Sequence, residues 1–187
     1  MFSDIVIPCL KGACSKEPDG YLIDEYFSIV CDILTHPKFL DMKNYHHHKM
    51  ITCHFHSVYV SYMTFLLCSR LGCKTREAVR AALLHDFYLY DWHITKHDTL
   101  HAWYHPKMAV LNAEKYIGEL SGMQKDMIYS HMWPLHFLPP KSREGMVLTF
   151  SDKLCTHMDM YKQSYRFLPV YYQIERRVLL ADTDNGC

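Results

Sequence analysis

The sequence contains no apolar run of the roughly 18 residues that a membrane-spanning helix needs. Residues 1–10 include Asp4 and Pro8 but no basic cluster, so we do not expect a secretory signal. Charge of one sign is not in excess either, because 20 acidic and 20 basic residues cancel. Such a chain has no broad electrostatic attraction for nucleic acid or an anionic membrane. We therefore expect a cytoplasmic protein that binds neither.

The eight cysteines include no C-x-x-C pair. Cys31 and Cys68 lie within apolar helical patterns, which predicts buried, reduced thiols rather than a disulfide framework. No repeat, low-complexity tract or linker divides the 187 residues, a length typical of one domain. Hydrophobic residues make up 49% of the chain, enough to build a core. A single domain over residues 1–187 is predicted.

Patterns typical of strands are scarce, and apolar residues recur at helical spacing, so the sequence predicts an all-α helical bundle. The first helix is expected at about 20–36. A second runs from about His56 to Gly72, a third from a Thr75 cap to His85, and a fourth begins at Pro106 with His105 as its cap. Two more are expected after Ser121 and Ser142, by a capping box and a polar cap. Residues 88–104 are predicted as a loop, and the tail after about 173 as a short helix that frays.

Histidine is unusually frequent, with 14 residues. It is the commonest metal ligand in proteins and the side chain that titrates near neutral pH. Number alone does not define a site, because the run His46–His48 is equally compatible with a solvated surface patch. The arrangement of the histidines therefore has to be considered.

The clearest local feature is His85-Asp86, directly after the apolar residues 81–84. Burying two ionisable groups without partners is costly, and a divalent metal ion removes that cost because imidazole and carboxylate are both good ligands. The alternative is an exposed helix end with a solvated carboxylate. A second pair, His97-Asp98, lies among polar residues and is predicted at the surface.

A histidine at the start of one helix, a His-Asp pair about 30 residues later and an aspartate on a late helix occur here as His56, His85-Asp86 and Asp152. In this order the chain resembles the HD superfamily of metal-dependent phosphohydrolases, with an HD core over about residues 45–161. The resemblance is strongest to small bacterial HD proteins, which share Leu-Leu-His-Asp and a nearby Tyr-Asp-Trp segment, here Tyr90–Trp92.

The resemblance also covers His105 and His131, which stand where dinuclear HD proteins have two further histidines. It implies that His56, His85, Asp86 and Asp152 hold one metal ion. Asp86 would bridge to a second ion held by His105 and His131. His85 and Asp86 would thus be catalytic residues, and the cofactor would be two divalent transition metal ions, iron or manganese.

Simpler interpretations remain open for several of these histidines. His105 is also a possible helix cap, and His131 a hydrogen-bonded core histidine. His54 competes with His56, because residues two apart lie on different faces of a helix and only one of them is expected to point inward. His101 is a reserve candidate.

By the same resemblance, the expected reaction is hydrolysis of a small phosphoester or nucleotide by metal-activated water. Residues considered for substrate binding are Lys153, His48 and Lys107, with Lys141 and Arg143 as further cations. The chain lacks the Gly-Tyr-Pro motif of the HD branch that cleaves cyclic dinucleotides. Two alternatives stay open: a di-iron oxygenase with the same ligands, and a catalytically silent nucleotide-binding HD protein.

Overall fold

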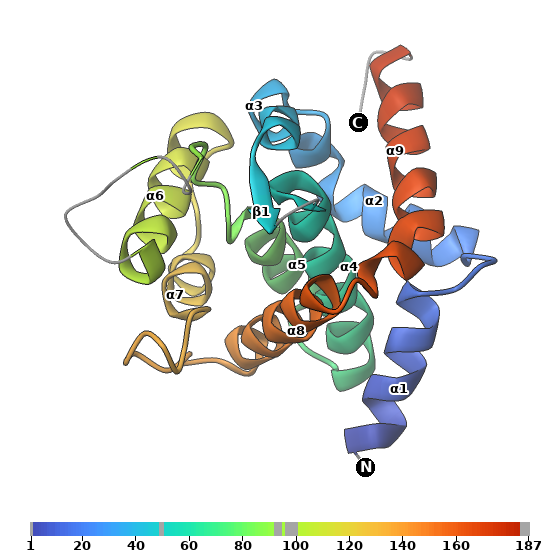
Figure 1. Ribbon diagram of the computed structural model, residues 1–187, viewed down its shortest axis with the longest axis horizontal. Coiled ribbons are helices and arrows are strands. Elements are labelled where there is room, and N and C mark those ends of the chain that lie inside the picture. Colours follow the sequence, from blue (N-terminus) through green and yellow to red (C-terminus); the bar gives the residue numbers. More distant parts are fainter. Residues whose placement is uncertain (1, 49–50, 92–94, 96–100, 184–187) are drawn as a thin grey trace.

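The computed structural model describes residues 2–48, 51–91, 95 and 101–183, and these residues form an all-α protein (Figure 1). The predicted fold class is thus confirmed. The α-helices are α1 (Phe2–Ala13), α2 (Gly20–Leu34), α3 (Pro37–Leu40), α4 (Cys53–Leu71), α5 (Thr75–Leu84), α6 (His101–Tyr116), α7 (Gly122–Ser130), α8 (Arg143–Met160) and α9 (Leu168–Thr183). Two 3-10 helices, η1 (Asp41–Asn44) and η2 (Ser164–Phe167), and a small antiparallel pair of strands, β1 (His46–His48) and β2 (Ile51–Thr52), complete these elements. The strands were not predicted. None of the described helices has both the length and the apolar character required to cross a bilayer.

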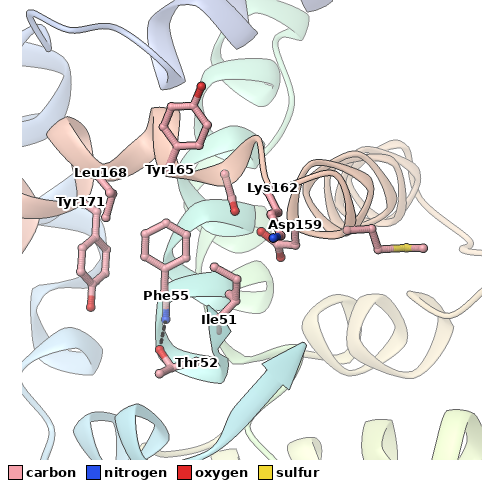
Figure 2. Close-up of a pocket in the computed structure, with 10 residues that line it drawn as sticks. Ile51, Thr52, Phe55, Asp159, Lys162, Tyr165, Leu168 and Tyr171 are labelled. Atoms are coloured by element: carbon pink, nitrogen blue, oxygen red, sulfur yellow. Dashed lines mark hydrogen bonds between the residues drawn. The ribbon is translucent and has the colours of Figure 1, made fainter. Parts of the chain in front are cut away.

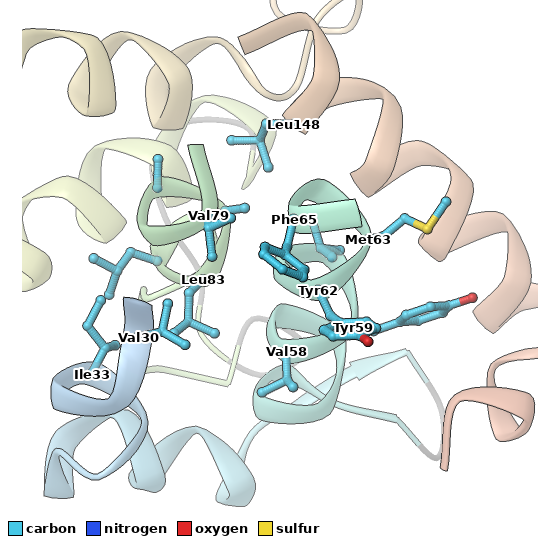
Figure 3. Close-up of a cluster of buried hydrophobic side chains, with 14 of the residues drawn as sticks. Val30, Ile33, Val58, Tyr59, Tyr62, Met63, Phe65, Val79, Leu83 and Leu148 are labelled. Carbon is cyan, nitrogen blue, oxygen red and sulfur yellow. The ribbon is translucent and has the colours of Figure 1, made fainter. Parts of the chain in front are cut away.

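Helix α4 forms the centre of the fold, and every residue from Cys53 to Cys68 is buried. Its neighbours are α1, α5 and α8. Figure 3 shows Tyr62 and Phe65 of α4 in one cluster with Val79 of α5 and Leu148 of α8. Each large apolar side chain buried in this way contributes about 1.5–3 kcal/mol to folding. Because α4 is covered on all sides, its polar residues are buried as well, and they need partners inside the protein.

Local capping signals place several helix ends as predicted. Ser121 and Gln124 form a reciprocal capping box at the start of α7, and the Ser142 hydroxyl accepts from the backbone of α8. Gly72 ends α4 with a left-handed φ of 63°, a conformation that a residue without Cβ adopts at little cost. The N-cap of α5 is Lys74, one residue before the predicted Thr75.

Helix α6 corrects one expectation, because it begins at His101 rather than at Pro106. Pro106 lies inside the helix, and His105 is a helical residue and not its cap. The residues before Pro106 have tertiary partners: the Tyr104 ring lies 5.9 Å from that of Tyr90, and the Trp103 ring 4.1 Å from that of His136. Such packing extends the helix by more than a turn, in spite of the missing proline N–H.

The C-terminal helix is also longer than the sequence predicts. Instead of a short helix after about residue 173, α9 extends over Leu168–Thr183. Its buried residues Val170, Ile174 and Val178 are spaced four apart, so they lie on one face, and α9 packs against α2. Helix α1, which was not predicted, buries Cys9 and Ala13 and packs against α4.

Among the described residues, the cysteines agree with the expectation of reduced thiols except at Cys31. Six described cysteines are free: Cys9, Cys14, Cys53, Cys68, Cys73 and Cys155. Cys31 is disulfide-bonded, so the expectation was wrong there. The spacing of cysteines along a sequence does not reveal such a pairing.

Candidate metal centre

Five helices bring the six predicted ligands together in the interior. His56 comes from the first turn of α4, and His85 and Asp86 follow directly after α5. His105 lies in α6, His131 follows α7, and Asp152 lies in α8. All six are buried, with exposed fractions of at most 6%. Residues far apart in the sequence thus form one polar cluster inside an apolar core.

The two carboxylates lie between the imidazole rings. Asp86 Oδ1 is 3.4 Å from His105 Nε2 and 3.9 Å from His131 Nε2, whereas Asp86 Oδ2 is 3.5 Å from His85 Nε2. Asp152 Oδ1 is 3.2 Å from His56 Nε2 and 3.6 Å from His85 Nε2. The two oxygens of Asp86 therefore face different histidines, and this is the arrangement that a bridging carboxylate requires.

Three of the histidines are oriented by an oxygen atom at Nδ1. His85 Nδ1 donates to the carbonyl of Ala82 at 2.8 Å, and His131 Nδ1 donates to the carbonyl of Ile128 at 2.7 Å. His56 Nδ1 is 2.8 Å from Asp159 Oδ2 and donates to it. With Nδ1 held in this way, Nε2 of each ring is turned toward the carboxylates. Metal-binding histidines are usually oriented like this, by an oxygen that accepts from the ring nitrogen pointing away from the metal.

One Nε2 atom of the cluster has no hydrogen-bond partner in the described part of the chain, and two others face each other. Among the described residues, buried His85 Nε2 has no hydrogen-bond partner. His105 Nε2 and His131 Nε2 face each other at 2.9 Å. Buried polar atoms without a partner are rare, and a metal ion is one of the groups that resolves them. Ligand atoms of three overlapping triads lie within 4.8 Å of one another: His47-His56-Asp86, His56-His85-Asp152 and His85-Asp86-His131. Imidazole and carboxylate ligands suit divalent transition metals, so the residues present fit such ions.

The electrostatics of the cluster also favour a cation. Burial alone would lower the pKa of His56, but its contacts with Asp152 and Asp159 outweigh burial and raise that pKa to about 10. Burial would raise the pKa of Asp86 and of Asp152, yet the neighbouring histidines hold both pKa values well below the usual range. By contrast, burial together with His105 and His85 lowers the pKa of His131 to about 3, which keeps its ring neutral. The carboxylates and His131 are thus in the forms that bind metal, and the raised pKa of His56 shows that its ring faces negative charge, which a metal ion can neutralise in place of a proton.

His47 belongs to the cluster, although the sequence did not single it out. Its Nε2 lies 3.2 Å from Asp86 Oδ2, and its ring stacks on that of His56 with centroids 3.8 Å apart. The signal was present only as the run His46–His48, in which spacing does not distinguish one histidine from the next. Strand β1, which pairs antiparallel with β2, places His47 at the site.

Of the two histidines in the first turn of α4, His56 joins the cluster and His54 does not. His54 and His56 are both fully buried, so the expectation that only one points inward was wrong. The reason is that α4 is covered on all sides. His54 does not join the cluster: its Nδ1 lies 3.0 Å from the Tyr171 hydroxyl. His97, Asp98 and the side chain of His101 lie outside the described residues.

A cavity of about 450 Å³ opens onto the cluster and is lined by His47, Asp86, His105, His131 and Asp152 together with Lys153. Lys153 Nζ donates to the carbonyl of His131 at 3.0 Å and to Asp152 Oδ2 at 3.3 Å. It is thus the predicted cation that the structure places at the site.

The other cationic candidates for substrate binding, Lys107, Lys141 and Arg143, do not line this cavity. Lys107 is exposed on α6 and does not line this cavity. Lys141 pairs with Asp126, and Arg143 donates to the carbonyl of Leu71. The side chain of His48 lies outside the described residues.

Comparison of the chain with family models, curated proteins and solved structures finds no match. The residues themselves therefore define the class of protein: an all-α protein with a buried histidine–carboxylate cluster that could bind metal ions.

Proposed function

We propose that this protein is a metal-dependent phosphohydrolase of the HD type that cleaves a small phosphoester or a nucleotide. The observation that carries the proposal is the orientation of His56, His85 and His131. Each donates its Nδ1 proton to an oxygen and turns Nε2 toward the carboxylates. Core histidines that serve only packing have no need to turn the same ring nitrogen toward a shared pair of carboxylates.

The proposed ligands divide into two groups that share Asp86. His56, His85, Asp86 and Asp152 would hold one divalent ion, iron or manganese, and His105 and His131 a second. The separate contacts of Asp86 Oδ1 and Oδ2 support this division. His47, close to Asp86 Oδ2, is a further nitrogen donor at the same centre.

When bound, such ions supply Lewis acidity and lower the pKa of water. Hydrolysis adds the water oxygen to phosphorus, breaks the P–O bond to the leaving group and yields phosphate and an alcohol or a shorter phosphate. The chain's own contribution is to position and neutralise the phosphoryl group. The Lys153 ammonium lies in the cavity wall, where it can pair with a phosphoryl oxygen, and with the Thr156 hydroxyl it also holds Asp152 in place.

The test is phosphate release by manganese-loaded protein without oxygen, across nucleotides and sugar phosphates. Turnover is expected, with none in metal-free protein and a large loss in Asp86→Asn, which keeps the side-chain size but removes the charge. Turnover that needs both iron and dioxygen would contradict hydrolysis and favour the oxygenase. Nucleotide binding without turnover would favour the silent binding protein.

A further inference from the structure

A second cavity, of about 730 Å³, lies beside the metal cavity. Figure 2 shows Phe55, Tyr165, Leu168 and Tyr171 around it, with Asp159 and Lys162 close together on one side. Its size is within the range of small-molecule sites, and its walls are mainly apolar and aromatic with a few polar groups. None of the proposed metal ligands lines this second cavity.

The two cavities share a wall. Met160, which is 65% exposed, lines both of them. Phe55 lines the second cavity, and the next residue, His56, belongs to the metal cluster. The hydrogen bond between His56 Nδ1 and Asp159 Oδ2 crosses the partition, because Asp159 lines the second cavity. If the phosphoryl group of a substrate lies at the metals, the rest of the molecule can therefore reach the second cavity.

The chemistry of the walls indicates what that part is. Phe55, Tyr165 and Tyr171 offer ring faces and edges for stacking. Lys162 adds a cation beside Asp159, whose carboxylate is buried and bonded to His56. A flexible, exposed methionine between the cavities can adapt to a group that passes from one to the other.

We infer that this cavity is the subsite for the leaving group of the substrate, and that the leaving group carries a flat aromatic or heterocyclic ring. The inference rests on the proposed phosphohydrolase function and narrows its substrate class to aryl or heterocyclic phosphoesters, among them nucleotides. Sugar phosphates and short alkyl phosphates leave the aromatic walls without a partner.

The test compares methylphosphonate with benzylphosphonate, which share one charged head group but differ by a phenyl ring. Their P–C bonds resist hydrolysis, so binding to manganese-loaded protein can be measured by calorimetry without turnover. Benzylphosphonate is expected to bind at least about tenfold more tightly, because burial of a ring contributes that much to affinity.

Two variants and a matched control locate the effect. Tyr165→Ala and Leu168→Ala should reduce the preference for benzylphosphonate severalfold and leave methylphosphonate affinity and metal content unchanged. Tyr172→Ala is the control, because Tyr172 is similarly exposed, at 64% against 59% for Tyr165, and does not line the cavity.

Equal binding of the two phosphonates, or an equal preference in all variants, overturns the subsite and leaves the proposed function intact. Failure of manganese-loaded protein to bind either phosphonate overturns the proposed function, and the subsite with it.

Discussion

His56 and Asp159 are joined by a buried hydrogen bond of 2.8 Å between Nδ1 and Oδ2. The two residues come from α4 and α8, and the side chain of neither is exposed. Because the Nδ1 proton is held by Asp159, Nε2 of His56 faces Asp152 at 3.2 Å. Asp159 is thus a positioning residue for a proposed ligand, although it would not touch the metal.

Asp159→Ala should weaken metal binding by roughly 10- to 100-fold, the usual effect of removing a group that orients a metal-binding histidine. Asp159→Asn retains an acceptor for the Nδ1 proton and should lie between Ala and wild type. Competition with a chromophoric chelator measures the affinity. Asp182→Ala, at an exposed position of α9, is the control and should bind metal as the wild type does. Equal affinity in Asp159→Ala and wild type would show that this bond does not serve the metal centre.

The two buried histidines of α4 provide a matched pair. His56→Gln should lose tightly bound metal, because it removes a proposed ligand. His54→Gln should keep the metal and cost about 1–3 kcal/mol in unfolding free energy, since His54 bonds to the Tyr171 hydroxyl outside the cluster. Metal content and denaturant unfolding of both variants separate the two roles. Metal loss in His54→Gln with retention in His56→Gln would reverse the assignment.

His105 and His131 are proposed to hold only the second ion. His105→Gln and His131→Gln should therefore reduce the metal content from about two ions to about one per chain and remove most of the activity. His136→Gln is the control, because His136 is also nearly buried but packs on Trp103 and does not line the metal cavity. If both ions are lost together, or both are kept, the division of ligands into two groups is wrong.

The packing of α9 is testable separately from the metal. Ile174→Ala should cost about 2–5 kcal/mol in unfolding free energy, because Ile174 is fully buried on the face that packs against the rest of the fold. Leu179→Ala, at a position that is 66% exposed, should change stability by less than about 0.5 kcal/mol. Equal, small effects would mean that α9 does not pack as described.

The parts of the fold that were predictable from sequence depend on short-range chemistry. The Ser121–Gln124 box and Gly72 define helix ends through atoms only a few residues away, and both were predicted at their observed positions. The extent of α9 and the start of α6 depend on partners distant in the sequence, so they were missed. Val178 and Trp103 have no local signal that reveals those contacts.

The same distinction holds for the site. His85-Asp86 stood out because two ionisable groups directly follow an apolar helix face. His47 could not be selected among three consecutive histidines, because its contact with Asp86 forms only when β1 packs beside the end of α5. Nor could Asp159 be found, since its role depends on a buried bond between two helices.

Metal content of the purified chain tests the central claim most directly. Protein prepared without chelators should contain about two iron or manganese ions per chain by elemental analysis, because the proposed ligands divide into two groups. Asp86→Ala, which removes the shared carboxylate, should contain less than one, whereas Asp98→Ala in the second His-Asp pair of the sequence should match wild type. No bound metal in the wild type, or equal losses in both variants, would contradict the metal centre described here.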